Sequence, residues 1–433
     1  MTGSRFRVDD VNSTDIGNAE AQGPGRSRRP AHRTSAWFVS TLLVGVLALS
    51  GCAAGSATGS AATDSSSSIT TTLVDSEATS ATTTTETITG TTAAAEAFLA
   101  TLSDEQRETL LYAYDDETKT TSWSNFPVTF VERAGLNLTD LTEEQQTAAL
   151  TVLQALLSDE GYATAVGIIE GDQYLLDNSS STEDSLGQYY IAFFGDPSDS
   201  SAWQVQFGGH HLGINATLDR AAGAITFAPT HLGSQPAVYP NGDGEQVQPL
   251  AGMYETAFAF YDSLTAEQQA ALYQGEQLQT MQCAPGGTCD YPTGTGLSGA
   301  ELTDEQRRLL LDVIANWAGL SDEQTTSTAL AEIEVTLDET WINWSGATAY
   351  DMTTGEGIYF QISGPEVYIE FASQEGSAGA DVDGVTTSGW GHIHTIYRDP
   401  SNDYAGSVTQ REAAGMGAGP GGGSPGGAPP AGG

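Results

Sequence analysis

Two pairs of histidines are the residues of this chain best suited to chemistry. His210 and His211 are adjacent and follow two glycines, whereas His392 and His394 are separated by one isoleucine. Imidazole is the commonest metal ligand in proteins, and it titrates closer to neutral pH than other side chains. We therefore expect a chemical site of this protein to include these four residues.

The spacing within each pair predicts which rings can meet. Residues two apart on a strand face the same way, so His392 and His394 should present both rings to one side of a sheet. His210 and His211 are neighbours and should point to opposite faces, so we expect only one of them to join the other pair. The apolar residues before this pair and those after it predict different histidines on the shared face. A bulge at Gly208-Gly209 would reconcile the two patterns.

Three imidazoles with one open coordination position suit a transition ion, and Zn²⁺ and Cu²⁺ are the candidates. Such an ion would act on water or a substrate oxygen as a Lewis acid, or would change redox state if it were copper. The alternative is that these histidines are structural and are hydrogen-bonded in a polar core. If a metal binds, Arg398 and Asp399 would orient ligating rings or hold a substrate anion. Alternatively, they would form a turn with Asp403.

Helix signals occur in two sets along the chain. Four Ser/Thr-x-x-Gln boxes begin at Ser103, Thr142, Thr265 and Thr303. In each box the hydroxyl can cap a helix, while the glutamine reaches back to the backbone N–H of the capping residue. Apolar residues recur at helical spacing behind the boxes. The boxes therefore predict four helices, two in each part of the chain.

Strand-like segments follow each pair of predicted helices in the same order. These segments cover residues 187–195 and 203–207 in the first part, and 357–364 and 367–371 in the second. A histidine pair comes after each set. Helices followed by strands favour an α+β fold with largely antiparallel sheets. We therefore predict two repeated halves, 95–250 and 251–408, related by a pseudo-twofold that brings the histidines to a shared cleft.

The two ends of the chain have compositions unlike that of the body. Residues 1–51 combine arginines with a short apolar run, as in an export signal. The run ends in Leu-Ser-Gly-Cys52, which resembles the bacterial lipobox and predicts a lipid anchor at the extracytoplasmic face of the membrane. The alternative is an ordinary signal peptide or a short anchor helix. Residues 52–94 and 409–433 are rich in small and polar residues, which predicts a disordered tether and a disordered tail.

Charge and cysteine content restrict the partners. The formal net charge is −42, and Lys119 is the only lysine. Nucleic acids are bound through clustered Lys and Arg, so we expect no nucleic-acid partner, and we expect a monomer. Outside the cytoplasm, Cys283 and Cys289 should form a disulfide across their short Pro-Gly loop.

The histidine motifs carry a family resemblance. Gly209-His210-His211-Leu212 and the segment from His392 to Tyr404, His-Ile-His-Thr-Ile-Tyr-Arg-Asp-Pro-Ser-Asn-Asp-Tyr, resemble signatures of a family of uncharacterised bacterial proteins named domain of unknown function 3500. The resemblance covers most of residues 95–408 and implies no activity. At His231 similar sequences carry apolar or aromatic residues, so the resemblance does not favour His231 as a ligand.

The sequence therefore predicts an exported lipoprotein with a histidine-rich transition-metal site in the cleft between two halves. A metal-dependent enzyme is one form of this prediction. A non-catalytic protein that binds a metal or small ligand is a second, and a surface protein without any site is a third. The chain contains no Gly-x-Ser-x-Gly, His-Glu-x-x-His or P-loop motif that would name a reaction.

Overall fold

The computed structural model describes residues 82–178, 187–352, 356–374 and 389–413. All of them belong to one compact unit of the chain. The predicted export signal, Cys52, most of the predicted tether and the end of the tail lie outside the described residues. None of the helices in the described ranges has the length and apolar character needed to span a membrane.

The elements up to residue 247 are mainly helices followed by strands, although two short strands lie between helices. The helices are α1 (Thr84–Thr101), α2 (Asp104–Leu110), α3 (Thr118–Thr121), α4 (Glu143–Leu156) and α5 (Asp159–Asn178). The strands are β1 (Leu111–Tyr112), β2 (Leu136–Asn137), β3 (Tyr190–Phe194), β4 (Trp203–Gly208), β5 (Leu212–Asp219), β6 (Ala224–Thr226), β7 (Thr230–Ser234), β8 (Tyr239–Pro240) and β9 (Gln246–Val247).

The later elements follow a similar order. The helices are α6 (Ala251–Ser263), α7 (Ala266–Leu272), α8 (Asp304–Ala318) and α9 (Glu323–Val335). The strands are β10 (Leu297–Ser298), β11 (Trp341–Gly346), β12 (Ile358–Ser363), β13 (Tyr368–Ser373) and β14 (Ile393–Arg398). The predicted strand segments are confirmed as β3, β4, β12 and β13.

All four predicted capping boxes are confirmed. Ser103, Thr142, Thr265 and Thr303 each accept a hydrogen bond from the backbone of the glutamine three residues later, and that glutamine returns one to the cap. These bonds satisfy backbone donors that a helix start leaves unpaired. They explain why α2, α4, α7 and α8 begin where the sequence predicts.

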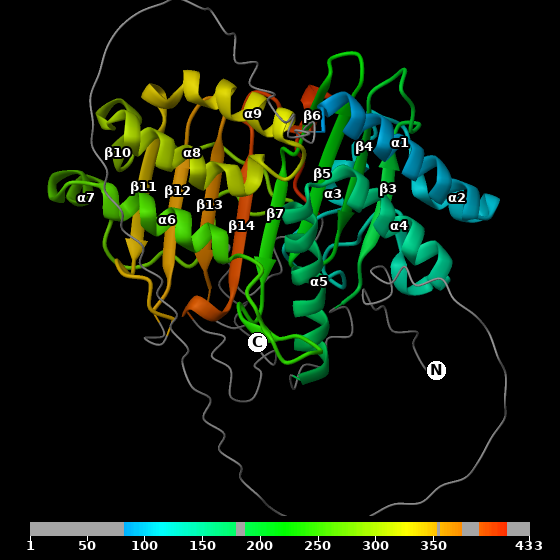
Figure 1. Cartoon of the computed structure of the whole chain (residues 1–433), viewed down its shortest axis with the longest axis horizontal. Coiled ribbons are helices and arrows are strands. Elements are labelled where there is room, and N and C mark those ends of the chain that lie inside the picture. The colour runs from blue at the N-terminus through cyan, green and yellow to red at the C-terminus, as the bar shows by residue number, and fades with distance from the viewer. Residues whose placement is uncertain (1–81, 179–186, 353–355, 375–388, 414–433) are drawn as a thin grey trace, which may run out of the picture. The chain divides into compact units, whose positions relative to one another are not determined.

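A single sheet of 12 strands joins both parts of the described chain. Its main order is β3-β4-β5-β7-β14-β13-β12-β11, and every neighbouring pair in this series is antiparallel. β1 is an exception because it pairs with β3 in parallel. The predicted mixed helix and strand fold with a largely antiparallel sheet is confirmed, and β7 and β14 lie at its centre (Figure 1).

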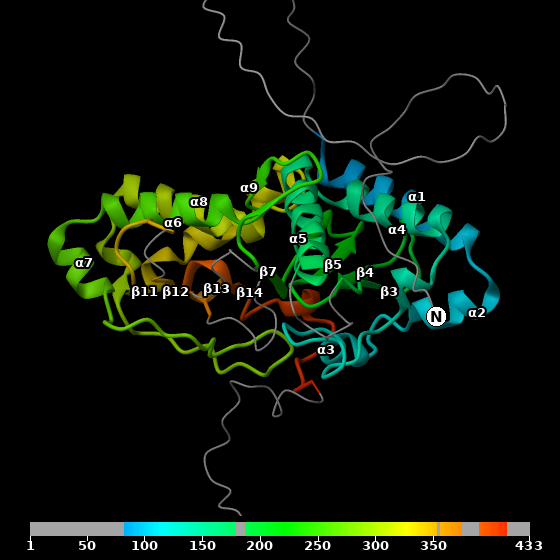
Figure 2. The same cartoon turned by 90° about the horizontal axis from the view of Figure 1, so that it is seen from below.

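The two faces of this sheet differ in polarity. Paired residues share a face, so the pairing places Phe207 and Ile214 on one side, and Gln206 and Asn215 on the other. Helices including α1, α4, α6 and α8 cover the apolar side, while long connections run along the opposite side (Figure 2). Both sides are buried. The polar side therefore needs internal hydrogen bonds, such as that from Gln206 Nε2 to the Lys119 carbonyl at 2.8 Å.

Two boundaries predicted from sequence are wrong. Helix α1 begins at Thr84, so residues 84–94 belong to the folded body and not to a tether. Thr83 and Glu86 form a capping box there, and buried residues such as Ile88 recur along the helix. At the other end, Ala413 is buried and its N–H donates to the Gly286 carbonyl at 2.9 Å. Residues 409–413 therefore pack on the body.

The disulfide between Cys283 and Cys289 is confirmed. Its loop lies against the polar side of the sheet, because Glu370 on β13 accepts the backbone N–H groups of Gln282 and Cys283 at 2.8 Å each.

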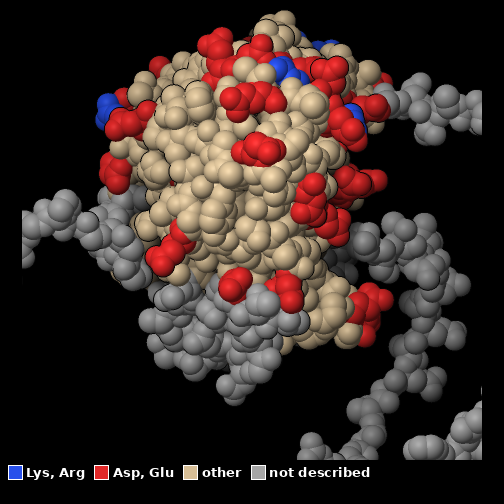
Figure 3. All heavy atoms as spheres, turned by 90° about the vertical axis from the view of Figure 1, so that its left-hand side faces the viewer, with Lys and Arg blue, Asp and Glu red and all other residues tan. Residues whose placement is uncertain are grey.

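The surface carries the acidity seen in the composition. On the side shown in Figure 3, acidic side chains are widespread and basic ones are few.

Candidate metal centre

His210 and His211 lie in the turn that joins β4 to β5. Gly208 and Gly213 are the last paired residues, and the Gly209 N–H donates to the Leu212 carbonyl at 2.8 Å. The two rings stack with centroids 4.1 Å apart, and both side chains are buried. The expectation that only one of them would join the other pair is wrong, because alternation holds only in extended strands.

His392 and His394 approach the same place from the start of β14. Their rings share one face of the sheet, with centroids 4.8 Å apart, as their spacing predicts. The His394 ring lies 5.1 Å from that of His211 and 5.7 Å from that of His210. The expectation that two histidine pairs so distant in sequence converge is confirmed.

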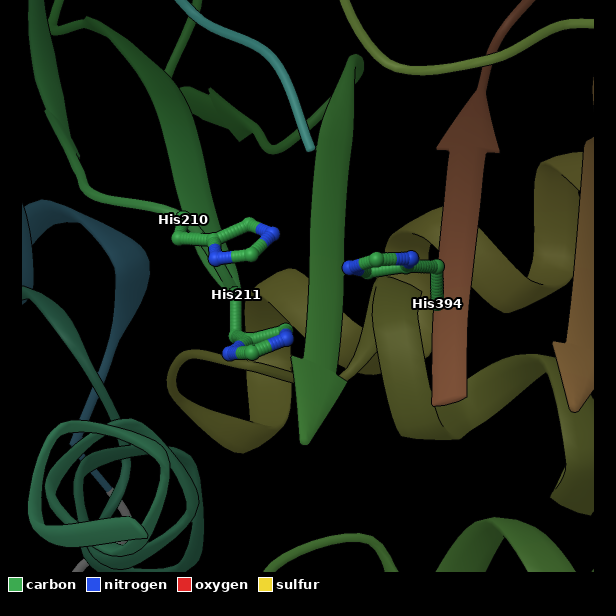
Figure 4. Close-up of side chains that lie close together, drawn as sticks. All are labelled: His210, His211 and His394. Carbon is green, nitrogen blue, oxygen red and sulfur yellow. The ribbon is translucent and has the colours of Figure 1, made fainter. Parts of the chain in front are cut away.

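Gly233 on β7 lies between these rings and has no side chain that would separate them. It pairs with His394 on β14, and on its other side its N–H donates to the His211 carbonyl at 2.6 Å. A Cβ at this position would lie 2.8 Å from His394 Cδ2 and 3.3 Å from His211 Cδ2. Figure 4 shows the rings on either side of β7 and directed toward each other. Only glycine leaves this space open.

Three of the histidines have the geometry of a metal site. His210, His211 and His394 each offer a ring nitrogen, and these nitrogens all lie within 4.8 Å of one another. Tetrahedral ligands about 2.0–2.1 Å from an ion are separated by roughly 3–4 Å, so a small contraction would complete the set. His392 lies 5.6 Å from His211 between ring centroids, and His231 lies 6.0 Å from His394. Both flank the three-histidine set.

A buried carboxylate orients His211. Asp172, on the buried side of α5, contacts His211 Nδ1 through Oδ1, and its Oδ2 accepts the Tyr189 hydroxyl at 2.6 Å. Nδ1–H therefore donates to the carboxylate, and the lone pair lies on Nε2. That nitrogen is buried and has no hydrogen-bond partner among the described residues. A carboxylate behind a histidine is the usual support of a metal-bound imidazole.

An amide orients His394 in the same way. Gln374 donates through Nε2 to the Gln279 carbonyl at 3.1 Å, so its Oε1 is left to accept from His394 Nδ1 at 2.7 Å. His394 Nε2 then carries the lone pair, and it too is buried without a partner in the described structure. Buried polar atoms are nearly always hydrogen-bonded in folded proteins. Two buried lone pairs that meet at one place could both bind a cation.

His231 and His210 extend this pattern. His231 Nε2 donates to the His210 carbonyl at 3.1 Å, and its Nδ1 is buried without a hydrogen-bond partner in the described ranges, as is His210 Nδ1. Burial, followed by the neighbouring imidazoles, holds the pKa of His210, His231 and His394 well below the usual histidine value. The neutral ring is the form that binds a metal.

The turn that carries His210 and His211 is held from behind by a buried arginine. Arg133 donates through Nη2 to the carbonyls of Gly209 at 2.8 Å and Ser124 at 2.7 Å. These bonds tie the turn to the connection before β2 and fix the direction in which the two rings leave the backbone. Arg133 therefore positions the histidines without touching their nitrogens.

Arg398 and Asp399 are not part of this arrangement. Arg398 donates through Nε to Asp403 Oδ2 at 2.6 Å, and Asp403 Oδ1 accepts the Asp399 N–H at 3.0 Å. The turn interpretation of this segment is confirmed. The prediction that these two residues support the histidines is wrong, because they lie at the far end of β14 from His394. Asp172 and Gln374 take that role.

Sequence reasoning missed Asp172, although the chain contains a signal for it. The residue occupies the apolar stripe of α5 beside Ile168, Ile169 and Leu175, where a carboxylate has no reason to be buried unless it has a partner. Gln374 and Gly233 carry no comparable signal. Their roles depend on strand pairing between segments that are far apart in sequence.

Comparison with known proteins gives a family without an activity. No curated protein and no solved structure is similar to this chain. A model of one family, described as a protein of unknown function (DUF3500), matches residues 84–406. The match starts with α1, spans every histidine of the site and ends in the turn after β14. The chain therefore belongs to the DUF3500 family.

Proposed function

We propose that this protein binds one transition-metal ion through His210, His211 and His394. The observation that carries the proposal is the set of buried imidazole lone pairs, in which His211 and His394 are each held by an acceptor on the opposite ring nitrogen. An empty arrangement of this kind leaves desolvated acceptors without compensation, at a cost of about 1–3 kcal/mol each. A bound cation removes that cost.

Ligand chemistry favours zinc or copper. The three donors are neutral nitrogens, which suit borderline ions, whereas calcium and magnesium prefer oxygen ligands. No described residue offers a thiolate there, since Cys283 and Cys289 form a disulfide with each other. The ring of His392 lies beside His394 and is the fourth ligand that we propose. Bound metal would supply Lewis-acid chemistry or, if it were copper, one-electron chemistry.

Burial favours a binding protein over an enzyme with a large substrate. The exposed fractions of residues His210, His211, His392 and His394 are 7, 0, 4 and 3 %. Two cavities in the described part of the chain, one beside Tyr397 and one beside Arg133, have no histidine among their lining residues. The proposed centre therefore resembles closed metal sites more than open ones, which keep a coordination position for substrate.

We also propose that the protein is a lipoprotein anchored to the membrane through Cys52. The support is the lipobox in the sequence, and the disulfide agrees with a location outside the cytoplasm. The acidic composition argues against nucleic-acid partners. Mass spectrometry of the mature N-terminus tests the anchor. A diacylglycerol on Cys52 is expected, and an unmodified chain that begins elsewhere would contradict it.

Duplication of one unit is the origin that we propose for the two halves. Its support is a pair of equivalent contacts: Gln145 donates to Gln106 at 3.1 Å, and Gln306 donates to Gln268 at 2.9 Å. The main sheet order also runs from β3 to β7 and then back from β14 to β11. In this correspondence the two histidine pairs do not occupy equivalent positions. His210 and His211 lie between β4 and β5, the second and third strands of one half, whereas His392 and His394 lie at the start of β14, the fourth strand of the other. Superposition of the halves in a crystal structure would test it.

Metal analysis of untagged protein tests the proposed function. We expect about one zinc or copper ion per chain, and its loss in both His211→Ala and His394→Ala. Gln361→Leu is the matched control, because Gln361 is a buried polar residue on the same sheet face, two strands away from β14. Circular dichroism should show that all three variants fold. The absence of metal after titration of folded, chelator-treated protein with either ion would overturn the proposal.

A further inference from the structure

A second candidate site lies on the opposite side of the central strands. A cavity of about 160 Å³ opens beside Tyr397 at the end of β14, between α9 and β6. These elements lie next to one another in Figure 1. Tyr397 is three residues after His394 on the same strand, so it faces the helices and not the histidines. The cavity is therefore separate from the proposed metal centre.

The ionisable side chains at this cavity are acidic. Glu332, Glu366 and Asp399 are among the lining residues, which include no lysine or arginine. No described lysine or arginine forms an ion pair with these three carboxylates. Burial, followed by the nearby carboxylates of Glu366 and Asp403, raises the pKa of Asp399 to about 6. The cavity therefore has uncompensated negative charge.

One serine lies between two of these carboxylates. Ser401 Oγ is 2.7 Å from Glu366 Oε2 and 2.9 Å from Asp399 Oδ1. A hydroxyl has one proton, so it can donate to only one of the two oxygens at a time. The other close contact then joins two electron-rich oxygens. A cation beside them would relieve this repulsion.

Tyr397 supplies an independent sign of a ligand. The residue is 5 % exposed and lines the cavity, yet its hydroxyl makes no hydrogen bond to another described residue. Burial raises the pKa of this hydroxyl, so it stays neutral at physiological pH. The hydroxyl of a mostly buried tyrosine usually finds a partner. Here the open direction is toward the cavity, where a bound group would provide one.

The remaining wall is apolar. Phe227 and Ile333 line the cavity together with Ala318 and Ala329. A hard metal ion needs several oxygen ligands around it and gains nothing from such a wall. A volume of this size has room for roughly ten non-hydrogen atoms, on the order of ten water positions. Acidic groups on one side and apolar groups on the other match an organic ammonium ion.

We propose that this cavity binds a small primary amine with an apolar body. The ammonium group lies between Asp399 and Glu366, where it donates to both carboxylates and compensates their negative charge. The Tyr397 hydroxyl accepts a further N–H bond. The apolar body packs against Phe227 and Ile333. This site does not depend on the metal centre.

Calorimetric titration of the full-length protein with phenethylammonium chloride tests the proposal. We expect saturable binding of one amine per chain, at least tenfold weaker binding of 2-phenylethanol, and no binding of phenylacetate. Tyr397→Phe and Asp399→Asn should each weaken amine binding about tenfold, and Ala329→Trp should abolish it by filling the cavity. Glu267→Gln, a change at an exposed carboxylate on α7, should leave it unchanged.

The results distinguish an amine site from an apolar pocket and from a calcium site. Thermal unfolding midpoints and metal content equal to those of the unchanged protein would show that the variants fold. If folded Asp399→Asn bound the amine as tightly as the unchanged protein, the carboxylates would not recognise it and the proposal would fail. Equal binding of the alcohol and the amine would show an apolar pocket only, and binding of Ca²⁺ without the amine would show a different site. Either result overturns the proposal.

Discussion

The two faces of the central sheet are both buried, but they are buried by different means. On one face, side chains such as Phe360 and Phe371 stack at 5.1 Å between ring centroids beneath the helices. On the other face, Gln361 donates to the Tyr368 hydroxyl at 3.0 Å, and Gln206 donates to Asn215 at 2.7 Å. The apolar face supplies free energy of folding through area removed from water. The polar face is held by directional hydrogen bonds, and bonds of this kind orient the histidine side chains.

This difference shows why the candidate site lies where it does. A metal centre needs ligands held in fixed directions, with partners behind them, and a purely apolar core offers none. The connections that cover the polar face bring Arg133 and Gln374 to the histidines. The same face carries Glu370, which holds the disulfide loop. Changes on the two faces should therefore separate stability from metal binding.

The largest expected effect on stability is on the apolar face. Phe360→Ala removes a ring that stacks on Trp344 and Phe371, so the free energy of unfolding should fall by about 3–5 kcal/mol. Denaturant titration of the chelator-treated protein measures this loss. The variant should still bind one ion per chain wherever it is folded. Loss of metal from the folded variant would show that the two faces are not separable.

Gly233→Ala should affect metal binding more than stability. The added methyl would lie 2.7 Å from the Ile393 carbonyl oxygen and 2.8 Å from His394 Cδ2, so the ring has to move. We expect a stability loss of about 1–3 kcal/mol from overpacking. Metal should be lost from the purified protein. Gly223→Ala is a poor control because its φ is positive, whereas Gly90→Ala on α1 meets no atom and should leave metal content unchanged.

Asp172→Asn tests the support behind His211. An asparagine keeps the size of the side chain but removes the charge that orients the ring, and such changes lower metal affinity by about 10–100-fold. Competition with a coloured chelator gives the affinity. Asp399→Asn is the matched control, since its carboxylate lies in the turn after β14 and should not alter metal affinity. Equal affinities in both variants would contradict the orienting role.

Stability of the metal-free protein should also depend on pH. The pKa values of His210, His231 and His394 are held well below the usual value by burial, so the folded protein resists their protonation. The unfolded chain takes up protons near pH 6.5 and then binds more of them, so stability should fall as the pH drops below that value. The slope is at most about 1.4 kcal/mol per pH unit for each histidine. Thermal melts of metal-free protein at pH 7.5 and 5.0 measure it, and equal midpoints would contradict it.

Local sequence was enough to predict much of the fold. The boxes at Ser103, Thr142, Thr265 and Thr303 act within one turn, so their bonds form wherever the helix forms. The alternation in β4 and β12 likewise depends on neighbours in the chain. The Cys283–Cys289 loop closes over a few residues, which made its disulfide predictable. The start of α1 was missed because its buried face is mostly threonine, which composition alone assigned to a tether.

The site itself was decided partly by sequence and partly by tertiary structure. The histidine types and the spacing of His392 and His394 predicted the candidate ligands. Their convergence with the other pair was predicted from a duplication in which the two pairs match, whereas the sheet order places them at different positions of the two parts. The participation of both His210 and His211 depends on a turn whose geometry alternation cannot describe. The partnership of Asp172 with His211, and the gap at Gly233, depend on contacts between α5, β7 and β14. Such contacts form only when the sheet assembles, because no local backbone preference brings these segments together.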